Sequence, residues 1–165
     1  MATLALLLSQ NNRATEAAQM GQAARALSDE LIQKHPKNIV FYKTRIRAQY
    51  ALSQLDPSFM DHAINTAKQA RTLAPTDAKL TYNMALFYIE KNDNENATKY
   101  LDETLRLKPN YIDPRYAKAV LYSNLAKETP GKAAEYRAVA KSELDYILTK
   151  VDPTHKASQD LLKSL

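Results

Sequence analysis

The sequence contains no cysteine and no tryptophan, and only two glycines occur among its 165 residues. The lack of cysteine excludes disulfide frameworks, thiol nucleophiles and cysteine-based zinc sites. The scarcity of glycine disfavours glycine-rich phosphate loops and β-sandwiches built on tight turns. Long apolar runs are also missing, since the run from Leu4 to Leu8 is too short to span a bilayer and lacks a positively charged leader. We expect no membrane insertion by this segment. We interpret the run from Leu4 to Leu8 as part of a helix that faces the core, and the chain as a piece cut from a longer protein.

The residues that are abundant favour helices. Ala, Leu, Lys, Glu and Gln dominate, and all are strong helix formers. A composition that is 45% hydrophobic and 25% charged is that of an ordinary folded domain. The net charge of +5 is spread along the chain, so nucleic acid is not an expected partner. A nucleic-acid binder would show affinity that falls steeply with salt.

The stretch from Pro75 to Pro109 has the pattern of a helical hairpin. Its first half carries apolar residues at helical spacing, and its second half repeats that spacing before ending ahead of Pro109. Thr76 or Asp77 is suited to cap the first helix, and the Asn/Asp-rich turn 91–94 to cap the second. The core positions predicted for this hairpin are Leu80, Met84, Phe87 and Tyr88, then Ala97, Tyr100, Leu101, Thr104 and Leu105.

Four prolines that follow helical segments divide the chain into similar units. Pro36, Pro75, Pro109 and Pro153 are separated by 39, 34 and 44 residues. We therefore expect a single domain, with each of the two longer units containing an insertion. Its parts are a partial repeat at 1–36, a repeat with a lengthened LDPSF turn at 37–75, the best repeat at 76–109, a repeat with the insertion KETPGKAAEYR at 110–153, and a capping helix at 154–165.

A helix-turn-helix period of 34 residues resembles that of tetratricopeptide repeats (TPRs). The match extends to the motif's small, aromatic and proline positions, with Thr81 and Thr104 as departures. The residues that carry the match are Met84, Ala85, Tyr88, Ala97, Leu101 and Pro109. The resemblance implies an all-α, right-handed solenoid of about three full hairpins, whose small residues let helices approach closely.

A narrower resemblance concerns residues 39–88. With its lengthened turn, this stretch is similar to the repeat region that follows the membrane helices of bacterial O-antigen ligase or polymerase-like proteins. That resemblance implies a soluble appended domain that recruits partners for glycan assembly. Nothing in the 165 residues resembles the membrane part itself.

The TPR resemblance also predicts a binding groove on the concave side, lined by the first helix of each hairpin. Its occupant would be an extended peptide or a partner's helix, and the positive charge on this face suits an acidic segment. A solvated helix face is the competing interpretation of each charge taken singly. The predicted groove residues are Lys43, Arg47, Lys79, Tyr82, Asn83, Leu86, Tyr116 and Val120.

One class of TPR protein grips a C-terminal carboxylate with a clamp of lysine, asparagine and arginine side chains. Lys43 and Asn83 match the clamp by position, whereas the third leading helix offers Asp113 and Ala117. The predicted clamp is therefore incomplete.

No pattern indicates catalysis. His35, His62 and His155 lack His, Asp or Glu partners at metal-ligand or catalytic spacing, so we interpret them as exposed or capping residues. We expect a non-enzymatic binding module with no cofactor and no metal. The partner's identity, self-association and location, whether cytoplasmic or on the outer side of a bacterial membrane, stay open.

Overall fold

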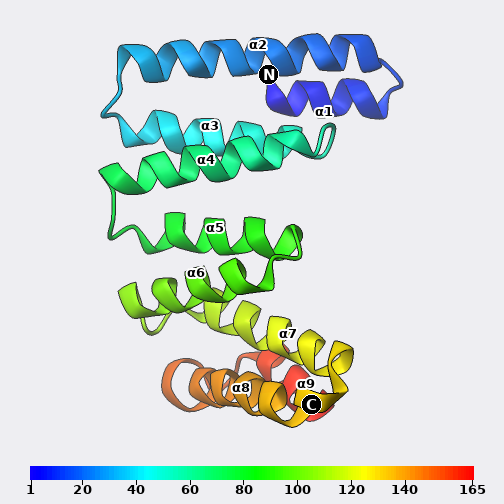
Figure 1. Cartoon of the computed structure of the whole chain (residues 1–165), viewed down its shortest axis with the longest axis vertical. Coiled ribbons are helices and arrows are strands. Elements are labelled where there is room, and N and C mark those ends of the chain that lie inside the picture. The colour runs from blue at the N-terminus through cyan, green and yellow to red at the C-terminus, as the bar shows by residue number, and fades with distance from the viewer. The chain divides into compact units, whose positions relative to one another are not determined.

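The computed structural model describes all 165 residues. It contains nine α-helices and no strand (Figure 1). The helices form two compact units, residues 1–80 and 81–165, and the division falls within the fifth helix. This confirms the expected all-α class built from helical hairpins. None of the helices combines the length and the apolar composition of a membrane-spanning segment.

The first unit consists of two hairpins joined at a short loop. Its helices are α1 (Ala2–Gln10), α2 (Ala14–Lys34), α3 (Ile39–Leu52) and α4 (Ser58–Leu73). Helix α1 packs against α2, α3 packs against α4, and α3 also contacts both helices of the first hairpin (Figure 1). Tyr42 and Ile46 of α3 are buried. Ala63, Ala67 and Ala70 of α4 are fully buried, which allows close helix packing.

Helix α1 differs from the expected core-facing fragment. Only Ala5 is fully buried, whereas Leu4 and Leu7 retain 47% and 51% of their accessible surface. A single helix buries one side against its neighbours, and consecutive leucines point around the helix axis. The run Leu4 to Leu8 is therefore apolar on more sides than α2 and α3 cover.

The lengthened turn between α3 and α4 has its own hydrogen bonds. The Asp56 carboxylate accepts a bond of 2.9 Å from the Ser58 amide at the start of α4. Below the turn, the buried Gln49 amide and Thr66 hydroxyl are hydrogen-bonded to each other at 2.8 Å. Two buried polar side chains thus satisfy each other between α3 and α4.

The second unit contains two further hairpins and a final helix. Its helices are the part of α5 (Ala78–Glu90) after Leu80, then α6 (Asn94–Leu107), α7 (Ile112–Glu128), α8 (Ala133–Tyr146) and α9 (Lys156–Ser164). The rings of Tyr88 and Tyr100 stack with their centroids 5.4 Å apart, which joins α5 to α6. Thr104 is fully buried and donates its hydroxyl hydrogen bond to the Tyr100 carbonyl at 2.7 Å. A threonine therefore fits this small-residue position because its polar group is satisfied within its own helix.

Local signals read from the sequence set the helix ends. Asp77 caps α5 by accepting from the Leu80 amide at 3.0 Å, and Asp93 caps α6 by accepting from the Asn96 amide at 3.1 Å. Asn92 adopts a left-handed φ of 56° in the turn between these helices. Asparagine tolerates this conformation better than most residues.

The predicted insertion at 127–137 is mostly helical. Helix α7 continues to Glu128 and α8 begins at Ala133, so only residues 129–132 connect them. Pro130 lies in a short 3₁₀ turn, because its ring cannot continue the preceding helix. The extra residues of this hairpin therefore lengthen its helices, and a π-helical turn, Ile147–Val151, extends α8 further.

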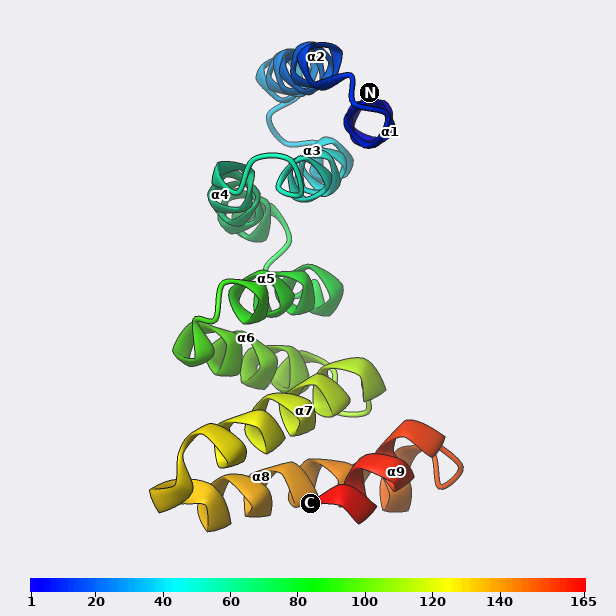
Figure 2. The same cartoon turned by 90° about the vertical axis from the view of Figure 1, so that its right-hand side faces the viewer.

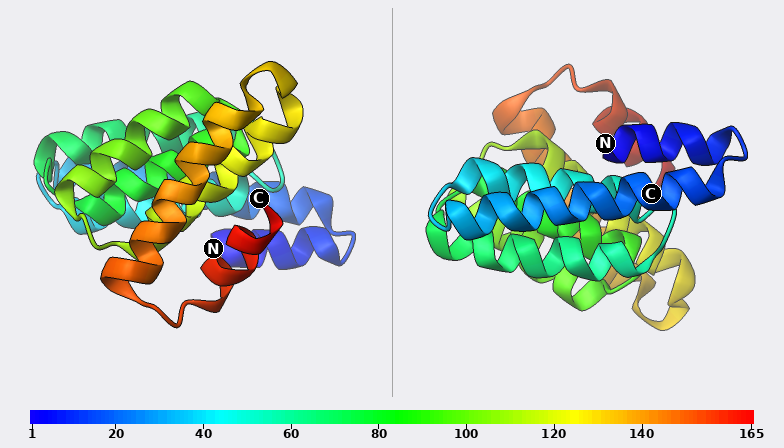
Figure 3. Two further views of the ribbon diagram at one scale, coloured as in Figure 1. Left: turned by 90° about the horizontal axis from the view of Figure 1, so that it is seen from below. Right: turned by 90° about the horizontal axis from the view of Figure 1, so that it is seen from above.

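The last helix covers part of the final hairpin, as expected. Leu161, Leu162 and Leu165 pack against a cluster formed by Ala119 and residues of α8. Figures 2 and 3 show α9 running beside α8. His155 caps α9, since its ring nitrogen Nδ1 accepts from the Ser158 amide at 3.3 Å. The predicted division of the chain into repeats stays a prediction.

Candidate functional site

Four of the predicted groove residues lie on one face of α5. Lys79, Tyr82, Asn83 and Leu86 follow the spacing i, i+3, i+4, i+7, which places them on one side of a helix. The opposite side is buried through Leu80, Met84, Phe87 and Tyr88. Leu86 retains 39% of its accessible surface although it is apolar. Helix α5 thus presents a mixed cationic, aromatic and aliphatic face.

The side chain of Tyr82 already makes an aromatic contact within the second unit. Its ring meets the edge of the Tyr111 ring at a centroid distance of 5.5 Å, and Lys108 Nζ lies 4.5 Å from the Tyr111 centroid. Burial, together with the nearby Asp113 and Tyr111, raises the pKa of Tyr82 to about 12. The phenol therefore stays protonated at neutral pH and can donate a hydrogen bond.

Lys43 on α3 is already paired inside the first unit. Its Nζ lies 2.5 Å from Oδ2 of Asp77, the residue that caps α5. Burial by itself raises the pKa of Asp77, but hydrogen bonds from Lys43 and from the Leu80 amide outweigh it, and the pKa lies below its ordinary value. This pairing argues against Lys43 as the lysine of a carboxylate clamp, because its charge is neutralised within the fold.

Arg47 has a different environment on the same helix. It is exposed and makes no ion pair, whereas its neighbour Arg45 lies 2.6 Å from Asp29. Val40 and Tyr50 share the face of Arg47 and are 60% and 41% exposed. We call the four residues Val40, Lys43, Arg47 and Tyr50 the α3 strip. Sequence reasoning found the two cations but missed the two apolar members, although the spacing i, i+3, i+7, i+10 places all four on one face.

Tyr116 and Val120 on α7 are both half-buried. Tyr116 packs against the cluster that α9 covers, and its ring meets the edge of the His155 ring at 5.7 Å. Tyr116 therefore contributes to the packing of the C-terminal cap. This role differs from the groove-lining position that the sequence predicted for Tyr116.

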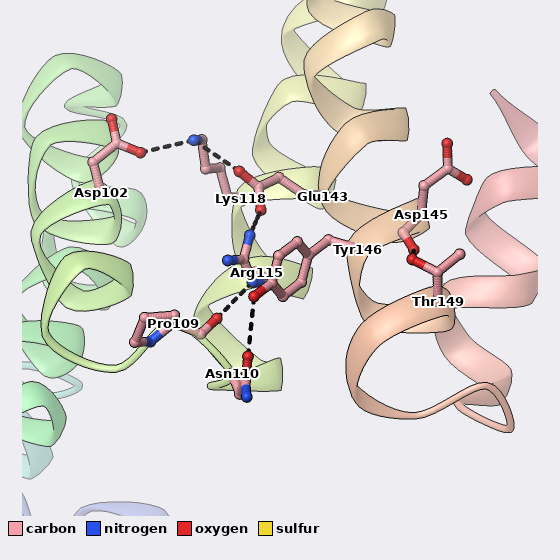
Figure 4. Close-up of polar contacts among 9 residues, drawn as sticks. All are labelled: Asp102, Pro109, Asn110, Arg115, Lys118, Glu143, Asp145, Tyr146 and Thr149. Atoms are coloured by element: carbon pink, nitrogen blue, oxygen red, sulfur yellow. Dashed lines mark hydrogen bonds and ion pairs between the residues drawn. The ribbon is translucent and has the colours of Figure 1, made fainter.

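An ion network between α6, α7 and α8 was not predicted (Figure 4). Glu143 accepts hydrogen bonds from Arg115 and from Lys118, whose Nζ lies 2.9 Å from Oε1. Lys118 Nζ also lies 2.7 Å from Oδ1 of Asp102 on α6. Burial alone lowers the pKa of Lys118, but its bonds to Asp102 and Glu143 outweigh burial and raise that pKa.

The guanidinium of Arg115 has further partners. It lies 3.5 Å from the ring centroid of Tyr146, and its Nε donates to the Pro109 carbonyl at 2.8 Å. The Tyr146 hydroxyl donates to Oδ1 of Asn110 at 3.0 Å (Figure 4). The ion pairs and hydrogen bonds of this network all lie within the second unit, so we interpret it as a structural feature.

Three hollows lie in the first unit, away from the predicted groove residues. One, of about 570 Å³, lies at the loop 35–39 between α2 and α3. Another, of about 500 Å³, is lined by small residues of α2, by the turn after α3 and by His62. Gly21 lines it, and a Cβ at this position would approach Leu52 Cδ2 to 3.2 Å. The third, of about 200 Å³, is bordered by α1, α2 and α3 and is mainly apolar.

The helical hairpins and their fully buried alanines define an all-α protein of TPR-like fold. Ala5, Ala63, Ala85, Ala97 and Ala119 are each fully buried, so neighbouring helices can approach closely.

Solved structures of MamA, a TPR-containing protein, share this fold. One superposes with a TM-score of 0.65 and 14% identity, covering 94% of this chain and 78% of MamA. A second gives a TM-score of 0.54 and 16% identity, with 99% and 85% covered. No family model and no curated protein matches the sequence. At this level of identity the likeness concerns the fold.

Proposed function

We propose that the chain is a non-catalytic protein-interaction module that binds an extended peptide or a helix of a partner on the exposed faces of its leading helices. The observation that carries the proposal is the face of α5, where Leu86 stays 39% exposed in line with Lys79, Tyr82 and Asn83. An accessible aliphatic residue among polar ones suits a partner that contributes both apolar contacts and hydrogen bonds.

The TPR-like fold supports a binding role, because stacked hairpins present side chains of their leading helices along extended surfaces. The partner we propose is a protein or peptide of acidic character. Residues 1–80 contain ten lysines and arginines against six aspartates and glutamates, which favours association with an acidic segment. The chain has no catalytic role in this proposal and needs no cofactor.

Site-specific photo-crosslinking tests the proposed surface. A photoreactive amino acid at Leu86 should capture the partner in cells, whereas the same residue at the exposed Lys99 of α6 should not. With the captured partner purified, Lys79→Glu should slow association and Asn83→Ala should speed dissociation, while helicity stays unchanged. Lys68→Glu on α4 is the matched charge control, since Lys68 is exposed and makes no ion pair. Equal capture at both positions would contradict the proposal.

A second, more specific proposal follows from the sequence resemblance of residues 39–88. In this proposal the chain is the appended domain of a bacterial O-antigen ligase or polymerase-like membrane protein, and it recruits partners for glycan assembly. Its support is that resemblance with the lengthened turn. The length of the complete gene product tests this proposal, because hydrophobic segments of about 20 residues upstream would be required.

A further inference from the structure

The α3 strip combines features of a docking surface on a single helix. Val40, Lys43, Arg47 and Tyr50 extend over about 15 Å, because a helix rises about 1.5 Å per residue. Val40 at one end of the strip is 60% exposed, the aromatic Tyr50 at the other end is 41% exposed, and the middle is cationic. Helix α3 carries three cationic side chains and no acidic one.

Only one of the three cations on α3 is available to a partner. Arg45 is held by Asp29, and Lys43 is held by Asp77 at the start of α5. Arg47 is exposed and makes no ion pair. An arginine guanidinium presents a planar fork of donors that matches a carboxylate in bidentate fashion.

We propose that the α3 strip binds an acidic-apolar segment of a partner protein, with Arg47 as the residue that selects a side-chain carboxylate. Val40 and Tyr50 contact apolar side chains of the same segment on either side of that carboxylate. This inference rests on the proposed function and adds the residue that selects the carboxylate and the apolar contacts on either side of it. It also transfers the carboxylate-binding role from Lys43, where the sequence pattern placed it, to Arg47.

The geometry of the strip sets the spacing of the partner's residues. Arg47 lies about 10 Å from Val40 and about 4.5 Å from Tyr50 along the helix axis. An extended strand advances about 3.3 Å per residue. The acidic residue should therefore lie about three residues from one apolar residue and one or two residues from the other.

Peptide display on the intact chain tests this pattern even while the natural partner is unidentified. Selection of short random peptides should enrich sequences with Asp or Glu between two apolar residues at this spacing. Synthetic versions are then amidated, so that no terminal carboxylate is present, and their affinity is measured by fluorescence anisotropy. Replacing the peptide's acidic residue by its amide should weaken binding about tenfold or more, as for loss of a charge-assisted bond.

Variants of α3 distinguish the contribution of Arg47 to peptide binding from that of Lys43. Arg47→Gln should weaken the peptide about tenfold, Arg47→Lys should weaken it less, and Lys43→Gln should leave its affinity nearly unchanged. A peptide whose acidic residue is replaced by arginine should bind Arg47→Glu better than it binds the original chain. Circular dichroism should show unchanged helicity, because Arg47 is exposed.

Several outcomes would overturn the proposal. Enriched peptides that lack an acidic residue, or a larger effect of Lys43→Gln than of Arg47→Gln, would contradict the role of Arg47. If peptide binding is weakened by Leu86→Glu but not by Arg47→Gln, the proposed function is supported and the α3 strip is not the binding surface. If no peptide is enriched, both the proposed function and the role of the α3 strip are contradicted. If sedimentation shows that the original chain is a dimer and that Val40→Asp is a monomer, a second copy of the chain occupies the strip and the proposal is overturned.

Discussion

Glu143→Ala is the substitution that should damage the second unit most. Glu143 is only 9% exposed, and its carboxylate binds Arg115 and Lys118 at once. Without it, two cations with side chains 12% and 15% exposed would face each other with no anion between them. Removing one partner from a buried ion pair typically costs about 3–5 kcal/mol.

The structure favours the lower end of that range. Lys118 keeps its bond to Asp102, and Arg115 keeps the Pro109 carbonyl and the face of Tyr146. We therefore expect a loss of about 3 kcal/mol in the free energy of unfolding. For a chain of this size that loss lowers Tm by about 10 °C.

Thermal and urea denaturation followed by circular dichroism measure this loss, and hydrogen exchange locates it. Amides of α7 and α8 should exchange faster than those of α3 and α4. Glu135→Ala is the matched control, because Glu135 is an exposed residue of the same helix and should change stability by no more than about 0.5 kcal/mol. If Glu143→Ala and Glu135→Ala unfold at the same temperature, the network contributes nothing to stability and the reasoning fails.

Three further predictions concern packing, the cap and pH. Ala97→Arg should unfold or severely destabilise the chain because Ala97 is fully buried, while Lys99→Ala should stay within about 0.5 kcal/mol, and similar melting curves would refute the helix register. Deleting residues 154–165 should accelerate hydrogen exchange in α8 before α6, whereas uniform acceleration would mean that α9 is not a cap. Because the pKa of Asp77 is lowered in the fold, its ionised form stabilises the chain above the ordinary carboxyl pKa. That stabilisation should be lost as pH falls through the lowered pKa. If the free energy of unfolding of an Asp77→Asn variant falls at acidic pH just as that of the original chain does, the stabilising role of ionised Asp77 is contradicted.

The secondary structure and most of the core could be predicted from the amino-acid sequence alone. Helical spacing of apolar residues identified the buried face of α5, and the capping residues Asp77 and Asp93 set where α5 and α6 begin. These features depend on residues within one or two turns of each other, so a local pattern is sufficient to predict them. The small residues at tight positions, such as Ala85 and Ala97, predicted close packing for the same reason.

Which charged groups are available to a partner depends on how the helices pack. Lys43 and Arg47 have equal charge and lie one turn apart, yet Asp77 neutralises the first and leaves the second exposed. Likewise, Arg115 and Glu143 are 28 residues apart and meet only because α7 packs against α8. Ion pairs between helices depend on the rotation of each helix about its axis and on the register of their packing. A periodic pattern constrains which face is buried, but it does not specify which partner each charged side chain meets on the facing helix.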